Sequence, residues 1–209
     1  MIGNHLEAEI HAVTGSSGGG KTTRVRTLVM KKKRTRTIIW SPKEPIDNYA
    51  SWYPGSVKCT TAAQVLDIVR AAGPKGKFHI VFVPSLDRKR DEAQFNAVCL
   101  IAYHARNLLF LADELHTVTR SNWACDGWSK LVMMGRGYGI HIYGTSQRPA
   151  NMDKNFLGNA STIHTRRLSE PEDAKTLAKS LGVKAAEVSA LSGFMWIERN
   201  KKTGVVTRG

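Results

Sequence analysis

The sequence is short of cysteine and of acidic side chains, and both shortages exclude classes of protein. It has three cysteines, an odd number, and no CxxC pair, so neither a disulfide framework nor a zinc knuckle is predicted and a reducing compartment is expected. Asp and Glu number 17 against 31 Lys and Arg, which gives a formal net charge of +14. Because such a surface attracts polyanions, nucleic acid is the expected partner, and an anionic membrane surface is the alternative.

Long apolar runs are also missing. The most apolar stretch, residues 97–112, is interrupted by His104, Arg106 and Asn107, so no membrane-spanning helix is predicted there. The N-terminus lacks the basic flank, apolar core and small-residue cleavage site of a signal peptide, so none is expected.

Short apolar runs of strand length alternate with helical patterns along the chain. This alternation predicts an α/β fold with a mostly parallel central sheet, helices on both faces and a C-terminal hairpin. No repeat or low-complexity linker divides the 209 residues, so a single domain over 1–209 is expected. The predicted strands are 9–13, 37–40, 78–83, 108–112, 140–144 and 161–164, with 194–198 and 204–207 as the hairpin. The predicted helices are 21–30, 61–72, 90–106, 122–135 and 171–181.

Three consecutive glycines lead into a lysine and two threonines in the segment VTGSSGGGKTT, residues 13–23. The segment matches G-x-x-x-x-G-K-[ST], in which bare backbone N–H groups curl around phosphate oxygens before a helix N-terminus. Lys21 is expected to reach the β- and γ-phosphates of ATP, and the Thr22 hydroxyl to bind Mg²⁺. The predicted phosphate-binding residues are Gly15, Ser16, Ser17, Gly18, Gly19, Gly20, Lys21, Thr22 and Thr23.

Two adjacent acids end the apolar run LLFLADE. Asp113 is expected to support Mg²⁺, and Glu114 to orient and deprotonate the attacking water. A base in this position favours ATP hydrolysis coupled to mechanical work over the chemistry of a nucleotide kinase. The next predicted strand, in IHIYGTSQRP, ends in a polar turn. If it pairs with the strand that carries Asp113, Gln147 lies near the γ-phosphate and can sense it.

Together these motifs resemble the FtsK–HerA superfamily of P-loop motor ATPases. The residues that carry the resemblance are GSSGGGKT (15–22), FLADE (110–114) and GTSQRP (144–149), with GRGYG and its Arg136 just before the last motif. A chain of this length without a membrane anchor resembles the genome-packaging ATPases of tailless, membrane-containing double-stranded DNA viruses. The resemblance implies a RecA-like core, a homo-hexameric ring, and an arginine supplied to ATP by the neighbouring subunit. Arg136 is the first candidate for that arginine, followed by Arg148 and Arg120.

The same resemblance implies an ATP-driven translocase of double-stranded DNA that packages a genome into a preformed capsid. Capsid-vertex or inner-membrane proteins are possible partners, and the virion or the host cytoplasm is the expected location. Two alternatives stay open: a membrane-associated phage assembly or secretion ATPase of the Zot type, and a nucleotide-dependent switch with negligible turnover. A nucleotide kinase is less favoured because no arginine-rich lid is evident.

Basic clusters are the expected contacts to the DNA backbone. They are Lys31, Lys32, Lys33, Arg34 and Arg36, then Arg88, Lys89 and Arg90, then Lys201 and Lys202. The segment TRSNWACDGW, residues 119–128, is predicted either to form a pore-facing loop or to pack its two tryptophans in the core or in a subunit interface.

Overall fold

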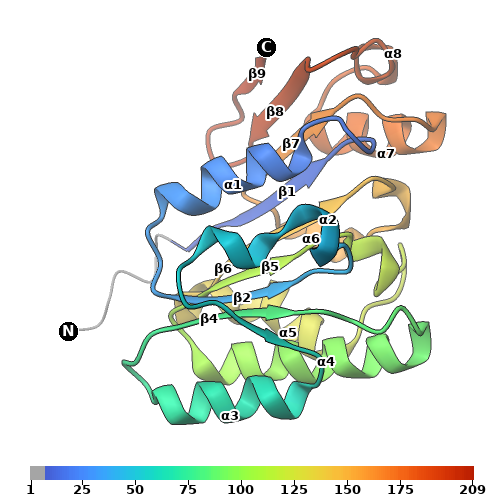
Figure 1. The fold of residues 1–209 in the computed structure, drawn as a ribbon. Helices are drawn as coiled ribbons and strands as arrows, with labels where there is room; N and C mark the ends of the chain where they lie inside the picture. The colour runs from blue at the N-terminus through green and yellow to red at the C-terminus, as the bar shows by residue number, and fades with distance from the viewer. Residues whose placement is uncertain (1–7) are drawn as a thin grey trace.

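A computed structural model describes residues 8–209 of the chain (Figure 1). The strands of this part are β1 (Ile10–Thr14), β2 (Arg36–Trp40), β3 (Val57–Cys59), β4 (Phe78–Phe82), β5 (Leu109–Ala112), β6 (His141–Ser146), β7 (Thr162–Arg166), β8 (Trp196–Asn200) and β9 (Val206–Arg208). The helices are α1 (Lys21–Lys31), α2 (Glu44–Asp47), α3 (Ala62–Ala72), α4 (Arg88–Ala105), α5 (Asp126–Met134), α6 (Lys154–Asn159), α7 (Pro171–Leu181) and α8 (Ala185–Ser189). Short 3₁₀ turns are η2 (Tyr49–Trp52), η3 (Leu115–Thr117), η4 (Gly135–Tyr138) and η5 (Pro149–Asn151).

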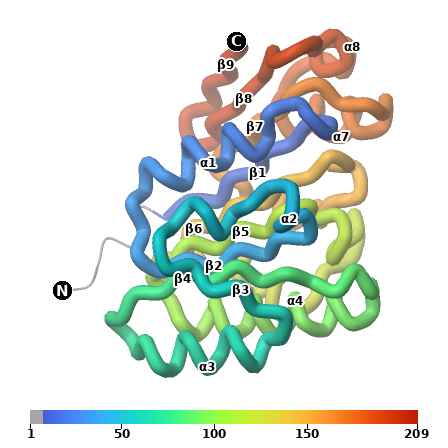
Figure 2. Tube along the Cα trace, in the orientation of Figure 1, coloured from blue at the N-terminus to red at the C-terminus, as the bar shows by residue number. Residues whose placement is uncertain are grey.

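The strands of the described residues form one sheet in the order β3-β4-β2-β5-β6-β1-β7-β8-β9. The seven strands from β3 to β7 in that order run parallel, and β8 and β9 close the sheet as an antiparallel hairpin. The predicted mostly parallel sheet with a C-terminal hairpin is therefore confirmed. Because parallel strands share one carboxyl edge, the turns that follow β1, β2, β5 and β6 meet there, on the right-hand side of the trace in Figure 2.

Helices cover both faces of the sheet, as predicted (Figure 1). On one face, Val25 and Val29 of α1 and the aromatic rings of η2 pack on Leu109 and Leu111 of β5. On the other face, α3, α4, α5 and α7 bury a larger apolar core that includes Phe110. Every residue of β5 is buried, because a central strand between two helical layers has no exposed face. This is why β5 reads as a continuous apolar run.

Local signals set most of the helix ends. The Thr61 side chain and Gln64 form a capping box at the start of α3, and the Asp87 carboxylate accepts the Arg90 amide at the start of α4. The helix predicted over 122–135 begins later, at Asp126, because Arg120 and Trp123 form an isolated bridge before it. The sequence analysis missed the short elements β3, α2, α6 and α8.

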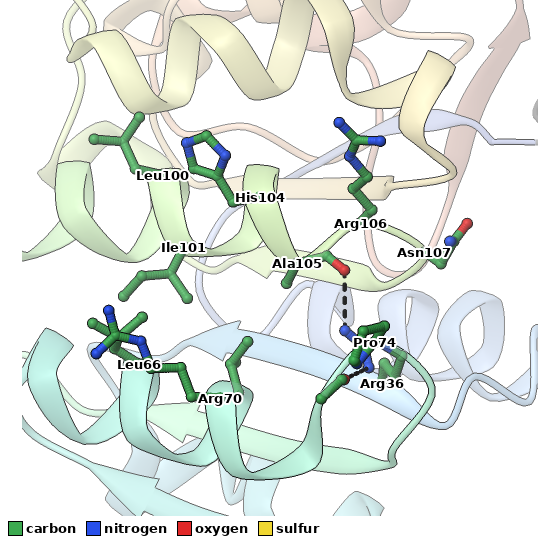
Figure 3. Close-up of a pocket in the computed structure, with 12 residues that line it drawn as sticks. Arg36, Leu66, Arg70, Pro74, Leu100, Ile101, His104, Ala105, Arg106 and Asn107 are labelled. Carbon is green, nitrogen blue, oxygen red and sulfur yellow. Dashed lines mark hydrogen bonds between the residues drawn. The ribbon is translucent and has the colours of Figure 1, made fainter.

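A cavity of about 740 Å³ lies between α3 and α4 (Figure 3), and no residue of the glycine-rich loop lines it. At one end of it Arg36 is buried and donates to the carbonyls of Gly73, Gly76 and Ala105. These carbonyls lie at or just beyond the carboxyl ends of the two helices, where a cation is stabilised. Arg36 therefore links β2 to the carboxyl ends of α3 and α4, and its predicted role as a DNA contact is wrong.

No helix among residues 8–209 is both long and apolar enough to cross a bilayer.

Candidate active site

The glycine-rich loop between β1 and α1 presents free backbone amides at the carboxyl edge of the sheet. Gly18 and Gly20 have φ values of 70° and 84°, which side chains other than glycine rarely adopt. Within the described chain, the backbone amides of Ser17, Gly18 and Gly20 and those of the first three residues of α1, Lys21 to Thr23, donate to no carbonyl. Together with the N-terminal end of α1 they form a positive concavity that suits an anion.

Lys21 and Thr22 lie at the floor of a cavity of about 470 Å³ that the loop encloses with the turns after β2 and β5. Lys21 is 8% exposed, and its Nζ donates to the Ser16 carbonyl at 3.2 Å. Burial lowers the pKa of Lys21, and the nearby Glu114 and Asp113 carboxylates oppose that shift. The Thr22 hydroxyl donates to Oδ1 of Asp47 at 3.1 Å, which leaves the lone pairs of its oxygen available to a cation.

Asp113 follows β5 directly and faces the same cavity. Its Oδ1 accepts the Thr145 hydroxyl at 2.6 Å, whereas its buried Oδ2 has no partner among the described residues. Burial raises the pKa of Asp113 to about 6 in the absence of a cation, against the hydrogen bond from Thr145. A buried carboxylate oxygen without a donor, near the Thr22 hydroxyl and Asp47, has the oxygen chemistry that Mg²⁺ prefers, so these residues fit this metal.

Glu114 is 3% exposed and adopts the left-handed conformation, with φ 48° and ψ 50°. Its amide donates to the Thr145 hydroxyl at 3.1 Å, which turns the side chain toward the glycine-rich loop and the turn after β6. Burial by itself raises the pKa of Glu114, but the hydrogen bond from Lys43 and the charges of Lys21 and Lys43 outweigh it and hold the pKa below its usual range. The carboxylate is therefore ionised and able to accept a proton.

Gln147 contacts Glu114, because β6 pairs in parallel with β5 and both strands end together. The Gln147 amide nitrogen Nε2 donates to Oε1 of Glu114 at 2.7 Å. His116 lies on the other side of the carboxylate, with Nδ1 3.4 Å from Oε2. The predicted pairing of the two strands is thus confirmed, and it brings the three motifs of the sequence to one site.

The structure adds residues that the motifs did not reveal, because they follow a different strand. Lys43 directly precedes α2, the short helix after β2, and Asp47 is the last residue of that helix; both line the cavity. Buried Glu44 fixes this segment by accepting the Ser41 hydroxyl and the backbone amides of Tyr49 and Ala50. The sequence signal was a charged and polar turn, SPKEPID, at the carboxyl end of a predicted strand. Position in the sheet, which the sequence does not give directly, is what makes it part of the site.

The candidate arginines lie in different places. Arg136 is exposed in η4, before β6 begins, so it lies at the opposite edge of the sheet from the loop of its own chain. Arg148 lies beside the site but is held by Asp173 at 3.0 Å, and Arg120 is paired with Glu92 at 2.9 Å. Arg166, the last residue of β7, belongs to none of the sequence motifs. Its guanidinium carbon lies 3.4 Å from the point where a Cβ on Gly20 would be.

The two tryptophans of residues 119–128 differ. Trp128 is completely buried among the rings of Phe95, Phe110 and Phe156, so the core interpretation holds for it. Trp123 is 38% exposed, and the guanidinium of Arg120 lies 4.8 Å from its ring centre.

Comparisons with known proteins find the same fold in a viral packaging NTPase and in a conjugation coupling protein. A search of protein families finds no match for the chain. Over 184 residues the chain is 24% identical to Protein P9 of Pseudoalteromonas phage PM2, a match that covers 88% of this chain and 80% of that protein. The genome-packaging NTPase B204 of Sulfolobus turreted icosahedral virus 2, solved with AMPPCP, superposes with a TM-score of 0.72 at 15% identity over 96% of each chain.

This chain has the fold of a P-loop NTPase. More distant likenesses agree with that assignment. The conjugation coupling protein TcpA of pCW3 gives a TM-score of 0.61 at 12% identity, over 97% of this chain and 60% of that one. The N-terminal domain of the zonular occludens toxin of Neisseria meningitidis gives 0.51 at 13% identity, over 97% and 93%. The resemblance to the FtsK–HerA superfamily and its genome-packaging ATPases that the sequence predicted is confirmed at the level of the fold.

Proposed function

We propose that the protein is a Mg²⁺-dependent ATPase whose hydrolysis drives the movement of double-stranded DNA, as in genome packaging. The observation that carries the proposal is the convergence of Lys21, Asp113 and Glu114 at one cavity beside free loop amides. Gln147 contacts the Glu114 carboxylate at this site. This set supplies a phosphate cradle, a metal support, an ionised base and a polar group next to that base.

Each residue of the site has its own role in the proposed hydrolysis of ATP. The loop amides and Lys21 bind the phosphate chain, and the hydroxyl of Thr22 and the free oxygen of Asp113 would hold Mg²⁺, which neutralises charge on the β- and γ-phosphates when bound. Glu114 would accept the proton of the attacking water, and Gln147 would align that water through its contact with Glu114. A glutamate held ionised in this position argues against a switch with negligible turnover.

The charge distribution supports DNA as the polymer that is moved. Arg88, Lys89 and Arg90 are exposed at the start of α4, at the same edge of the sheet as the glycine-rich loop. The cluster around Lys31 and Lys33 lies at the opposite edge, where α1 ends. Lys201 and Lys202 follow β8, whose last residue pairs with the first residue of β7, so they lie at that opposite edge too. Backbone contacts by such clusters are independent of base sequence, as a translocating motor requires.

A homo-hexameric ring completes the proposal, because the exposed Arg136 lies at the edge of the sheet opposite its own loop. In a ring, an arginine there is available to the nucleotide of a neighbouring subunit, where it would stabilise the charge of the transferring phosphate. A capsid vertex or a protein of the viral inner membrane is the proposed attachment point, in the virion or in the host cytoplasm.

The test is steady-state ATP hydrolysis by the purified protein, with and without long double-stranded DNA, at low and at moderate salt. We expect DNA to stimulate hydrolysis, more salt to weaken the stimulation, and Glu114→Gln to lower the rate by about 10²–10⁴-fold. EDTA should abolish the activity. Hydrolysis that is the same with and without DNA at every salt concentration would contradict the proposed coupling.

A second candidate function has one observation in its favour, the Zot-type fold match. In that case the basic clusters would serve an anionic membrane. Hydrolysis that responds to liposomes containing phosphatidylserine but not to DNA would support the assembly ATPase over the packaging motor.

A further inference from the structure

Lys43 places a second cation in the phosphate cavity, in addition to the lysine of the glycine-rich loop. It stands immediately before α2 and lines the cavity together with Lys21, Thr22, Asp113 and Glu114. None of the motifs in the sequence includes it.

The backbone that carries Lys43 is fixed, whereas its side chain is partly exposed and has a single ionic partner among the described residues. Glu44, the next residue, is 2% exposed and accepts three hydrogen bonds from Ser41, Tyr49 and Ala50. The Lys43 side chain is 38% exposed, and its one ion pair among the described residues is with Glu114, at 2.7 Å from Nζ to Oε1. A flexible four-carbon stem on an anchored turn allows the ammonium group to change partners without moving the fold.

The Glu114 carboxylate accepts three hydrogen bonds in this arrangement. Oε1 accepts both Lys43 Nζ and Gln147 Nε2 at 2.7 Å, and Oε2 accepts the Gln147 backbone amide at 3.3 Å with His116 at 3.4 Å. Three of the roughly four acceptor positions of this carboxylate are therefore taken, which restricts its access to a water hydrogen. The base is held by its neighbours in this arrangement.

We infer that Lys43 binds the terminal phosphate of the nucleotide. By doing so it breaks its ion pair with Glu114 and leaves that carboxylate free to accept a proton from the attacking water. A triphosphate brings several negative charges to a cavity in which Lys43 now faces a single carboxylate, so the ammonium group gains by moving to the phosphate. Occupancy of the terminal-phosphate position and availability of the base are then coupled through one side chain. The inference rests on the proposed ATPase function and assigns a phosphate-binding residue outside its motifs.

Binding measurements without hydrolysis test the exchange. Lys43→Met keeps the apolar stem and removes the charge, and we expect it to weaken the binding of AMPPNP by about 10- to 100-fold. The affinity for ADP, which lacks the terminal phosphate, should change by less than about threefold. Lys43→Arg should restore most of the AMPPNP affinity. Lys175→Met, which removes a lysine from the exposed pair with Glu172, is the matched control and should change neither affinity.

A double-mutant cycle tests the release of the base. Glu114→Gln removes the carboxylate that competes for Lys43, so this variant should bind AMPPNP several-fold more tightly than the unmodified protein. The gain should disappear when Lys43→Met is already present. Equal losses of AMPPNP and ADP in Lys43→Met, no loss of either, or a Glu114→Gln gain that persists without Lys43 would each overturn the inference while the proposed ATPase function stands. Failure of the unmodified protein to bind either nucleotide would overturn both.

Discussion

The hydroxyl of Thr145 on β6 lies 2.6 Å from Oδ1 of Asp113 and also accepts the backbone amide of Glu114 at 3.1 Å. One side chain on the neighbouring strand thus orients both acids at the end of β5. The other carboxylate oxygen of Asp113, Oδ2, has no hydrogen-bond donor among the described residues and could bind a cation.

Thr145→Val keeps the shape of the side chain and removes this hydroxyl. We expect the free energy of unfolding to fall by about 1–3 kcal/mol, because the Glu114 amide is then buried without an acceptor. The affinity for Mg²⁺ with ADP should fall as well, since Asp113 is no longer oriented. Chemical denaturation and calorimetric titration measure the two effects. Thr145→Ser, which keeps the hydroxyl, should leave both close to the original values, and equal effects of the two variants would contradict this role.

Gly20→Ala tests the phosphate cradle through its backbone. The φ value of 84° is strained for alanine, and the new Cβ would lie 3.4 Å from the Arg166 guanidinium carbon. We expect about 1–2 kcal/mol of destabilisation and a loss of ADP binding, because the loop amides shift. Gly158→Ala is the matched control: a Cβ at Gly158, in α6, meets nothing within 4 Å, and its φ is not positive. It should leave ADP binding unchanged and stability equal or slightly higher.

Mixed assemblies test whether Arg136 acts on a neighbouring subunit. Lys21→Ala removes the phosphate lysine and Arg136→Ala removes the exposed arginine, so each variant alone should hydrolyse ATP poorly. A mixture of the two should recover part of the activity, because some interfaces combine an intact loop from one chain with an intact arginine from the next. ATPase rates across mixing ratios measure the recovery, and nucleotide binding by Arg136→Ala alone should be nearly normal. A mixture no more active than the two separate variants would assign the trans role to another arginine.

Glu198 on β8 ties the hairpin to the rest of the sheet and should govern stability in acid. Burial alone raises its pKa, but hydrogen bonds from His164 and Arg24 outweigh burial and lower the pKa to about 2. A lowered carboxyl pKa stabilises the fold above the ordinary value near 4.5, and this contribution is lost as the pH falls from about 5 toward 2. Its size is at most about 3 kcal/mol at neutral pH.

Glu198→Gln should therefore lower the melting temperature at pH 7 and flatten the loss of stability below pH 5. Thermal melts across this pH range compare it with Glu172→Gln, which changes an exposed carboxylate and should behave like the unmodified protein. A melting temperature at pH 7 that is unaffected by Glu198→Gln would show that the ion pairs of the hairpin contribute little.

The sequence by itself determined the longer helices and strands and the motif residues, because their signals are local. A glycine-rich turn needs particular backbone angles, a buried central strand such as β5 needs a continuous apolar run, and α3 and α4 carry their caps within a few residues. These patterns predicted the parallel sheet, its closing hairpin and the pairing of the strand before Gln147 with the strand before Asp113. The prediction for Arg36 was wrong because it rested on local sequence alone. A run of basic residues is expected to be exposed, but the carboxyl ends of two helices converge on Arg36 and bury it.

The tertiary structure decided which other residues join the site. Lys43 and Asp47 follow β2, and their place in the cavity depends on the pairing of β2 with β5, which brings together residues about 70 positions apart. The placement of Arg166 against Gly20 likewise depends on β7 lying beside β1. Such contacts arise from the order of the strands in the sheet. Local sequence patterns do not give that order, so they do not predict these contacts.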